Sequence, residues 1–299
     1  MTRLICFVTV ISFFLFACTG TDNSGKVNVD SLLKVDTLKK NEKKSVNQII
    51  LGLGEPIDIV SLIYSEGVPF SAKQVVSPKF SDNLNTSYRR ALGLGIIETD
   101  FLYLAVNKKS NLSLAQIKAI KSLAEGLQVG HYFDDKQLIE FSKKPELNDS
   151  IITLANMGFN KMNKYLLDNN RAAECAMIVT GIWIESLYHA SQCIIETPNK
   201  KVIEYIGMQK QVMDELYVVL NTFKKEKEYQ EIIQNIELIK KEYDGVTIVT
   251  TDGETQKIVD ENGNITYQST SVSKVTISND QLKNISAIVE KIRNVLLNL

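Results

Sequence analysis

The sequence has few of the residues that usually carry chemistry. It contains only two histidines, one tryptophan and four cysteines among 299 residues. The zinc-protease motif H-E-x-x-H, the hydrolase elbow G-x-S-x-G, a glycine-rich phosphate loop and closely paired cysteines are all missing. These absences remove the commonest sequence evidence for an enzyme. We therefore expect a protein without catalytic residues, without a cofactor and without a bound metal.

An excess of charge of either sign is also missing. The chain carries 34 lysines and arginines against 35 acidic residues, which gives a net charge of −1. Proteins that bind nucleic acid usually gather positive charge on one face, because the phosphate backbone supplies much of the affinity. The balanced composition predicts no nucleic-acid partner.

The first residues have the pattern of an export signal. Arg3 precedes an apolar run from Leu4 to Phe16, which is shorter than the roughly 20 residues of a membrane-spanning helix. The run ends in Leu15-Phe16-Ala17-Cys18, which resembles the lipobox of bacterial lipoproteins, where the cysteine is acylated and becomes the first residue. The sequence predicts a lipoprotein signal over residues 1–17 and membrane attachment through Cys18. An ordinary secretory signal with an unrelated cysteine is the alternative.

The residues after the cysteine predict a tether in the cell envelope. Residues 18–45 are rich in Thr, Asn, Ser, Asp and Lys, a composition that buries too little apolar surface to order itself. Thr19, rather than Asp, follows the cysteine, and lipoprotein sorting then favours the outer membrane over the inner one. Several acyl chains such as palmitate on one cysteine give stable attachment. The sequence leaves open which leaflet carries the protein.

Two cysteines remain in the predicted domain. Cys6 leaves with the signal, and Cys175 and Cys193 lie 18 positions apart in one predicted helix. At 1.5 Å per residue they are separated by roughly 27 Å, far beyond the reach of a disulfide. We expect two buried free thiols.

The rest of the chain, residues 46–299, is dominated by helical periodicity. Pro56 in a first turn, Ser113 as an N-cap and Asp134 at a helix start mark some of the boundaries. The expected fold is all-α, a multi-helix bundle of antiparallel helical hairpins. The predicted helices cover residues 55–66, 87–108, 113–127, 134–144, 146–169, 171–196, 200–222 and 225–243, and a last one starts at residue 279.

One segment departs from the helical pattern. Residues 246–277 contain four short runs rich in β-branched residues, separated by Asp252-Gly253 and Asn262-Gly263. These dipeptides are strong hairpin signals. The sequence predicts a small β-meander inserted before the C-terminal helix, either as a decoration or as a binding hairpin.

Three stretches together resemble a family of predicted lipoproteins from Bacteroidota. They are Pro56-Ile-Asp-Ile-Val-Ser-Leu-Ile, Ala91-Leu-Gly-Leu-Gly-Ile-Ile-Glu-Thr-Asp-Phe-Leu-Tyr and Gly181-Ile-Trp-Ile-Glu-Ser-Leu-Tyr. The resemblance covers residues 46–243, with departures from the family pattern at Ile97-Glu98 and Val179-Thr180. It implies a lipid-anchored helical domain. The family carries no established activity, so the resemblance transfers no functional residues.

The second and third of these stretches also resemble each other. Asp100-Phe-Leu-Tyr-Leu-Ala and Glu185-Ser-Leu-Tyr-His-Ala share an acid-x-Leu-Tyr-x-Ala pattern, each shortly after a Gly-Ile pair. A duplicated helical hairpin would give two pseudo-symmetric halves. Chance similarity between two buried helices is the alternative.

Polar residues interrupt the apolar central helices. Residues 172–190 are apolar almost all the way round, which indicates a buried helix, yet they include Glu185 and His189 on one face. Asp100 lies in a similar apolar setting. A buried carboxylate is costly unless it is paired, hydrogen-bonded or protonated. These residues are therefore either structural or functional.

Three interpretations compete for these residues. The first is a structural polar network in a non-catalytic binding or structural module, which binds envelope protein or other envelope components. The second is a helical pocket for a small ligand. The third is a metal-dependent enzyme using Glu185 and His189, although helical di-metal sites use Glu-x-x-His, which is one residue shorter. The structural network is the preferred interpretation. The candidate residues are Asp100, Tyr103, Trp183, Glu185, Tyr188 and His189.

Overall fold

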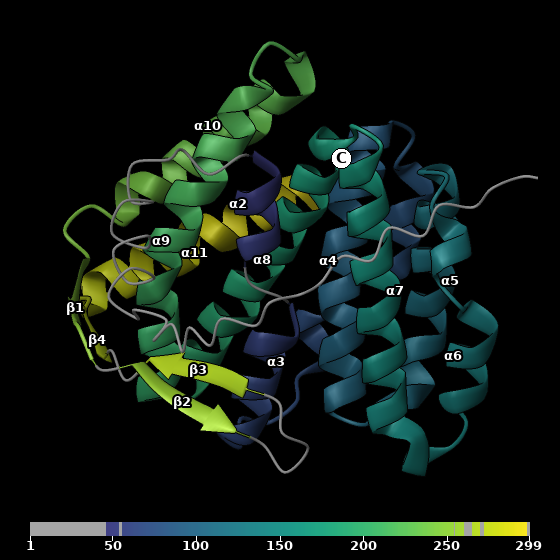
Figure 1. Cartoon of the computed structure of the whole chain (residues 1–299), viewed down its shortest axis with the longest axis horizontal. Coiled ribbons are helices and arrows are strands. Elements are labelled where there is room, and N and C mark those ends of the chain that lie inside the picture. Colours follow the sequence, from purple (N-terminus) through teal and green to yellow (C-terminus); the bar gives the residue numbers. More distant parts are fainter. Residues whose placement is uncertain (1–45, 54–55, 254, 260–264, 270–271, 298–299) are drawn as a thin grey trace, which may run out of the picture. The chain divides into compact units, whose positions relative to one another are not determined.

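A computed structural model describes residues 46–53, 56–253, 255–259, 265–269 and 272–297. The predicted signal (1–17) and tether (18–45) lie outside the described residues. Within the described part, the chain is a bundle of α-helices with short strands before the C-terminal helix (Figure 1). This confirms the predicted all-α fold with a β-rich insertion.

Almost all the helices match predicted ones to within a few residues. The exception is α2, whose seven residues are too few to show a clear period. The helices are α2 (Val46–Gly52), α3 (Pro56–Ser65), α4 (Ser87–Val106), α5 (Ser110–Gly126), α6 (Asp135–Phe141), α7 (Asn148–Asp168), α8 (Ala172–Glu196), α9 (Lys200–Thr222), α10 (Lys227–Glu242) and α11 (Asn279–Leu297). Short 3₁₀ turns lie between them: η2 (Ala72–Gln74), η3 (Pro78–Asn83), η4 (Gly130–Tyr132) and η5 (Pro145–Leu147).

Side-chain caps fix several helix starts. The Thr86 hydroxyl accepts a bond from a backbone N–H in the first turn of α4, Asp134 does the same for α6, and Asn199 for α9. The sequence predicts Ser113 as the cap of α5, but this helix begins three residues earlier. The Ser113 hydroxyl instead donates to the Lys109 carbonyl at 3.3 Å.

Helices α4 and α8 form the centre of the bundle and have the most extensive mutual contact. Every residue of α4 from Ala91 to Val106 is buried, as is every residue of α8 from Cys175 to Ser191. Both helices are therefore surrounded by protein on all sides, as the almost uninterrupted apolar sequence of α8 predicts. Any polar side chain on these helices has to find its partner inside the protein.

Two glycines set the distance between α4 and α8. A Cβ atom on Gly95 would lie 2.0 Å from the Ile178 carbonyl oxygen, and one on Gly181 would lie 2.1 Å from that of Leu92. Gly95 thus contacts the α8 backbone three residues before Gly181, and Gly181 contacts the α4 backbone three residues before Gly95. This reciprocal contact is the geometry that a duplicated helical hairpin would produce.

Segment 46–65 is long and apolar enough to cross a membrane by length and composition. In the described residues it forms two helices, α2 and α3, rather than one. Ile59 and Val60 have 0% exposure and pack against α4 and α8. We interpret this segment as part of the core, since core helices have the same composition as membrane spans.

The β-rich insertion pairs as a nested hairpin rather than as the predicted meander. β1 (Thr247–Thr251) pairs antiparallel with β4 (Val272–Thr276), and β2 (Thr255–Val259) pairs with β3 (Ile265–Ser269). Asp252-Gly253 joins two strands that do not pair, while Asn262-Gly263 lies outside the described residues. The β1–β4 ladder rests on α9, where a Cβ on Gly207 would lie 2.1 Å from Val275 Cγ1.

Cys175 and Cys193 are both buried and free, as predicted. They lie in the single uninterrupted helix α8.

Candidate functional site

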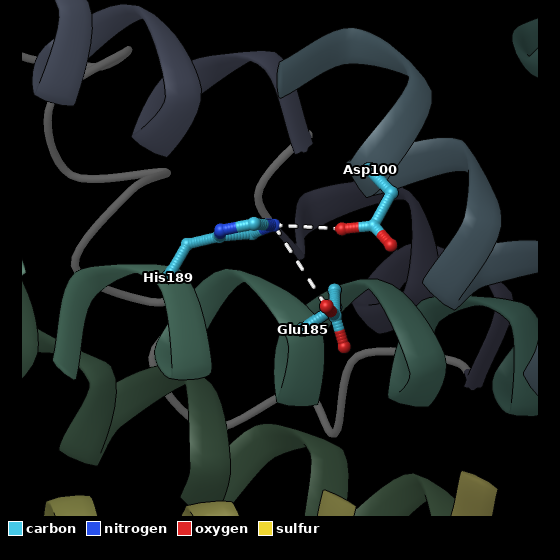
Figure 2. A group of neighbouring side chains, drawn as sticks. All are labelled: Asp100, Glu185 and His189. Atoms are coloured by element: carbon cyan, nitrogen blue, oxygen red, sulfur yellow. Dashed lines mark hydrogen bonds and ion pairs between the residues drawn. The ribbon is translucent and has the colours of Figure 1, made fainter. Parts of the chain in front are cut away.

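Asp100 and His189 meet at the centre of the bundle. Asp100 lies on α4, and His189 on α8, with 2.9 Å between Asp100 Oδ1 and His189 Nε2 (Figure 2). The other ring nitrogen, Nδ1, lies 3.2 Å from Gln74 Oε1 in turn η2. The second carboxyl oxygen of Asp100 accepts the Val76 N–H at 2.7 Å. The imidazole and carboxyl groups both have 0% exposure, so this chain of bonds is closed to solvent.

Glu185, one turn before His189 on α8, pairs with Arg293 from α11. Arg293 Nε donates to Glu185 Oε2 at 2.7 Å, and Arg293 Nη2 donates to Glu185 Oε1 at 2.6 Å. Nη2 also donates to the Gln74 carbonyl at 2.9 Å. This two-bond pairing is the strongest way to join a guanidinium to a carboxylate. Glu185 lies 3.8 Å from His189 Nε2, so both acids belong to one cluster.

One proton shared between Asp100 and His189 satisfies the bonds of this cluster. When His189 is neutral, its Nδ1–H donates to Gln74 Oε1, and its Nε2 accepts from a protonated Asp100 Oδ1. Glu185 then stays ionised against Arg293, and the four charged or titratable groups sum to zero. We therefore infer a charge-neutral cluster that holds one proton.

The pKa shifts agree with this arrangement in direction. Burial raises the pKa of Asp100 from 3.8 to about 7, against the opposing charge of Arg293. Burial, together with the charge of Asp100, raises the pKa of Glu185 from 4.5 to about 7. Burial lowers the pKa of His189 from 6.5 to about 4, which keeps the ring neutral. The two acids titrate as a pair, and Asp100 takes the proton because both Glu185 oxygens are bound to Arg293.

We expect the protein to lose stability as the pH rises from 6.5 to 8. Because the pKa values of Asp100 and Glu185 are raised, the folded state holds a proton that the unfolded state has already released. This bound proton stabilises the folded state, and the stabilisation is lost as the pH rises through about 7. The lowered pKa of His189 makes stability fall as the pH falls, but only below pH 6.5, the pKa of histidine in the unfolded chain. One retained proton corresponds to roughly 1 kcal/mol over this range. Melting curves across pH 6.5 to 8 measure the slope.

Asp100→Asn is the variant that tests the origin of this slope. Its side-chain NH₂ can donate to His189 Nε2 while its oxygen accepts from Val76, which reproduces the protonated acid. We expect it to remove most of the slope and to melt near the parent at pH 6. Asp82→Asn, at an exposed position, is the matched control and should keep the parental slope. A charged His189 would place donor against donor in Asp100→Asn, and a strongly destabilised variant at pH 6 would contradict the neutral-ring arrangement.

Aromatic side chains surround the cluster, as the sequence predicts for two of three candidates. The Tyr103 ring lies 4.4 Å from the His189 ring, centroid to centroid, and its hydroxyl accepts the Ser71 N–H at 3.1 Å. The Tyr188 ring lies 3.9 Å from the Arg293 guanidinium carbon, a cation–π contact. Trp183 lies elsewhere, on the side of α8 that faces α9. Its indole N–H donates to Gln209 at 3.0 Å.

Asp100, Glu185 and His189 are also the described residues that could hold a metal ion together. Their donor atoms all lie within 4.8 Å of one another, and all three side chains are buried. However, the Arg293 guanidinium already binds both Glu185 oxygens and neutralises this carboxylate. A divalent cation would have to displace an arginine that is held on three sides. The geometry therefore favours Arg293, rather than a metal ion, as the cation that neutralises Glu185. The absence of a bound metal stays a prediction.

Two members of the cluster, Arg293 and Gln74, are not among the residues that the sequence predicts for this site. A signal for Arg293 was present, because four-residue steps lead from Ile285 through Val289 to residue 293 on the buried stripe of α11. An arginine on such a stripe has to be paired. Gln74 lies in a single 3₁₀ turn with no periodic pattern, so nothing in the sequence marks it.

Cavities in the described part of the chain lie away from this cluster. One of them, of about 420 Å³, lies among α2, α4, α7 and α8. A neighbouring one of about 280 Å³ extends towards α9, and Trp183 is in its wall. A third, of about 400 Å³, lies between the first turns of α4, α8 and α10. None of these three cavities is lined by Asp100, Glu185 or His189. A ligand in any of them would therefore not contact the central carboxyl groups.

Comparison with known proteins does not assign a function. No protein-family model, no curated protein and no solved structure matches the chain. Function has to be argued from the residues of the chain itself.

Proposed function

We propose that the protein is a lipid-anchored protein of the bacterial envelope whose helical domain is a non-catalytic binding or structural module. The observation that carries the anchor is the sequence Leu15-Phe16-Ala17-Cys18 directly after a short apolar run that starts behind Arg3. Small Ala17 suits the cleavage position, and the Cys18 thiol accepts the lipid. Thr19 after the cysteine favours the outer membrane. The resemblance to Bacteroidota lipoproteins over residues 46–243 supports the same assignment.

The buried cluster supports a non-catalytic role for the domain. A general acid or base has to reach a substrate atom within hydrogen-bond distance. Asp100, Glu185 and His189 have 0% side-chain exposure, and their hydrogen bonds are made with Gln74, Val76 and Arg293. A cluster of this kind holds α4, α8 and α11 together. Its partner in the envelope, a protein or a small molecule, would bind elsewhere on the domain.

Replacing the anchoring cysteine tests the proposal. We expect Cys18→Ala to accumulate as an unprocessed precursor and to incorporate no fatty-acid probe, because the thiol is the group that is acylated. Metabolic labelling followed by gel analysis measures both effects. Cys193→Ala removes a buried thiol of α8 and is the matched control that should label like the parent. Equal labelling of the Cys18→Ala protein would exclude the lipoprotein assignment.

A further inference from the structure

Two adjoining cavities follow one face of α8. Four positions on this face, spaced as neighbours on a helix, line the smaller cavity of about 280 Å³: Val179, Ile182, Trp183 and Ser186. The first two of them also line the cavity of about 420 Å³, as does Leu53, directly after α2. Small-molecule sites commonly enclose roughly 300 to 1,000 Å³. The pair therefore has room for a ligand made of two linked units.

The polar lining of the 420 Å³ cavity is mostly carboxamide. Asn156, Asn160 and Asn163 follow one another at four- and three-residue steps along α7, so they share one face of this helix. Asn47 on α2 belongs to the same lining. Each carboxamide offers both donors and an acceptor. Ligand groups that also donate and accept, such as hydroxyl and amide groups, complement such a lining.

The charged residues of this lining have partners within the protein. Lys164 and Asp168, both exposed at the mouth, form an ion pair with 3.1 Å between Nζ and Oδ2. Glu98, on the α4 side of the wall, also has an interaction partner. An ionic ligand would have to compete with these interactions. The larger cavity is therefore better suited to an uncharged ligand.

Hydroxyl and amide groups also line the 280 Å³ cavity. The Trp183 indole N–H donates to Gln209 Oε1 at 3.0 Å, which leaves the NH₂ group of this carboxamide as a donor. The hydroxyl groups of Ser186 and Tyr205 are neighbours in the same wall, and Ser186 Oγ lacks a hydrogen bond of ordinary geometry. A ligand hydroxyl between them can bond to both. Asp58, exposed at the edge, adds acceptor oxygens.

We propose that the two cavities bind a neutral N-acetylated sugar, with one ring of a disaccharide in each. The acetamido group of one ring pairs its N–H and C=O with the asparagines of α7, and its methyl group contacts Ile50 and Val179 in the apolar wall. The hydroxyl groups of the other ring bind to Ser186, Tyr205 and Gln209. This inference rests on the proposed binding role of the domain but not on its lipid anchor. Sugar titration and fatty-acid labelling therefore fail independently.

The single tryptophan of the chain provides the measurement. Because Trp183 is in the wall of the 280 Å³ cavity, its fluorescence reports a bound sugar ring. The purified full chain is titrated with three β-1,4-linked disaccharides of the same shape: N,N′-diacetylchitobiose, cellobiose, and the dimer of glucosamine. They carry acetamido, hydroxyl and ammonium groups respectively at the same ring position.

We expect N,N′-diacetylchitobiose to bind at least tenfold more tightly than cellobiose, because only its acetamido groups add an amide hydrogen bond and a buried methyl group. The glucosamine dimer should bind no more tightly than cellobiose, since its charge has to enter a partly apolar cavity. Equal affinity for the three sugars, tightest binding of the glucosamine dimer, or no binding of N,N′-diacetylchitobiose would overturn the proposal.

Two variants of α7 locate the site. Asn163→Leu keeps the approximate side-chain volume and removes one half-buried carboxamide, so we expect at least a threefold loss of the preference for N,N′-diacetylchitobiose over cellobiose. Asn284→Leu, at an exposed position of α11, is the matched control and should keep the preference. Asn160→Phe fills the mouth from an exposed position of α7 and should abolish binding. Parental preference in Asn163→Leu together with parental affinity in Asn160→Phe would show that the sugar binds elsewhere.

Discussion

Replacing Gly181 with alanine is expected to cause one of the two largest losses of stability among single methyl additions in the core, the other being at Gly95. The new Cβ would lie 2.1 Å from the Leu92 carbonyl oxygen and 3.1 Å from the Ile96 nitrogen, both backbone atoms of α4. A flexible side chain could move aside, but a helix backbone cannot. The two central helices must separate, which breaks the contacts along their whole crossing. We expect a cost above the usual 1–3 kcal/mol of overpacking, and a melting temperature lower by roughly 10 °C or more.

Gly95→Ala should behave in the same way, since its Cβ would meet the Ile178 carbonyl oxygen at 2.0 Å. The matched control is Gly52→Ala at the end of α2, where no atom lies within 4 Å of the added Cβ. Alanine gains up to about 1 kcal/mol of helix propensity over glycine, so this control should melt at or above the parental temperature. Thermal unfolding followed by circular dichroism compares the variants. A Gly181→Ala variant as stable as its parent would show that α4 and α8 are not in backbone contact.

Glu185→Ala is expected to have the second large effect, a loss of about 3–5 kcal/mol, the range for breaking a buried ion pair. The substitution leaves the Arg293 guanidinium buried, with 6% side-chain exposure and without its two charge-assisted bonds. Glu185→Gln keeps one acceptor and the packing volume, so we expect it to lose less. Denaturant unfolding measures these differences. An equally or more stable Glu185→Ala variant would contradict the structural role, because functional sites are where stability is often sacrificed.

A double-mutant cycle separates the ion pair from the general cost of substitution. Glu185→Leu and Arg293→Leu each leave an uncompensated buried charge, whereas the double variant removes both charges. We expect the double variant to be more stable than the sum of the single losses predicts, by about 1–3 kcal/mol. Glu204→Ala, in an exposed pair with Lys200, should change stability by less than about 1 kcal/mol. Strict additivity of the two leucine substitutions would exclude a coupled pair.

The helices could be predicted because each one repeats its apolar residues at a regular interval. The stripe of α11 illustrates this: Leu282, Ile285, Val289, Ile292 and Leu296 are all buried, as the period requires. The strands were found by composition, but their order was not. Local turn signals such as Asp252-Gly253 predict which strands are joined by a tight turn, whereas the pairing of β1 with β4 depends on contacts distant in the sequence.

The site was predictable only in part, for a related reason. Asp100, Glu185 and His189 are polar residues within apolar helices, and their burial alone requires that they find partners. The partners come from elements that are distant along the chain, and a single sequence does not pair them. Trp183 was grouped with these residues because it shares their helix. The structure places Trp183 on another face of α8, because it is two residues from Glu185 and residues two apart on a helix point in different directions.

The pairing of Arg293 with Glu185 and with the Gln74 carbonyl also sets the order in which the nascent chain can fold. The cation stands 108 positions after its carboxylate partner and 219 after the carbonyl that it binds. Until the ribosome has made almost the whole protein, Glu185 has no guanidinium to neutralise it. We therefore expect the contact of the central helices with α11 to be the last to form. For a chain with the proposed export signal, we expect this contact to form only after the last helix has been delivered.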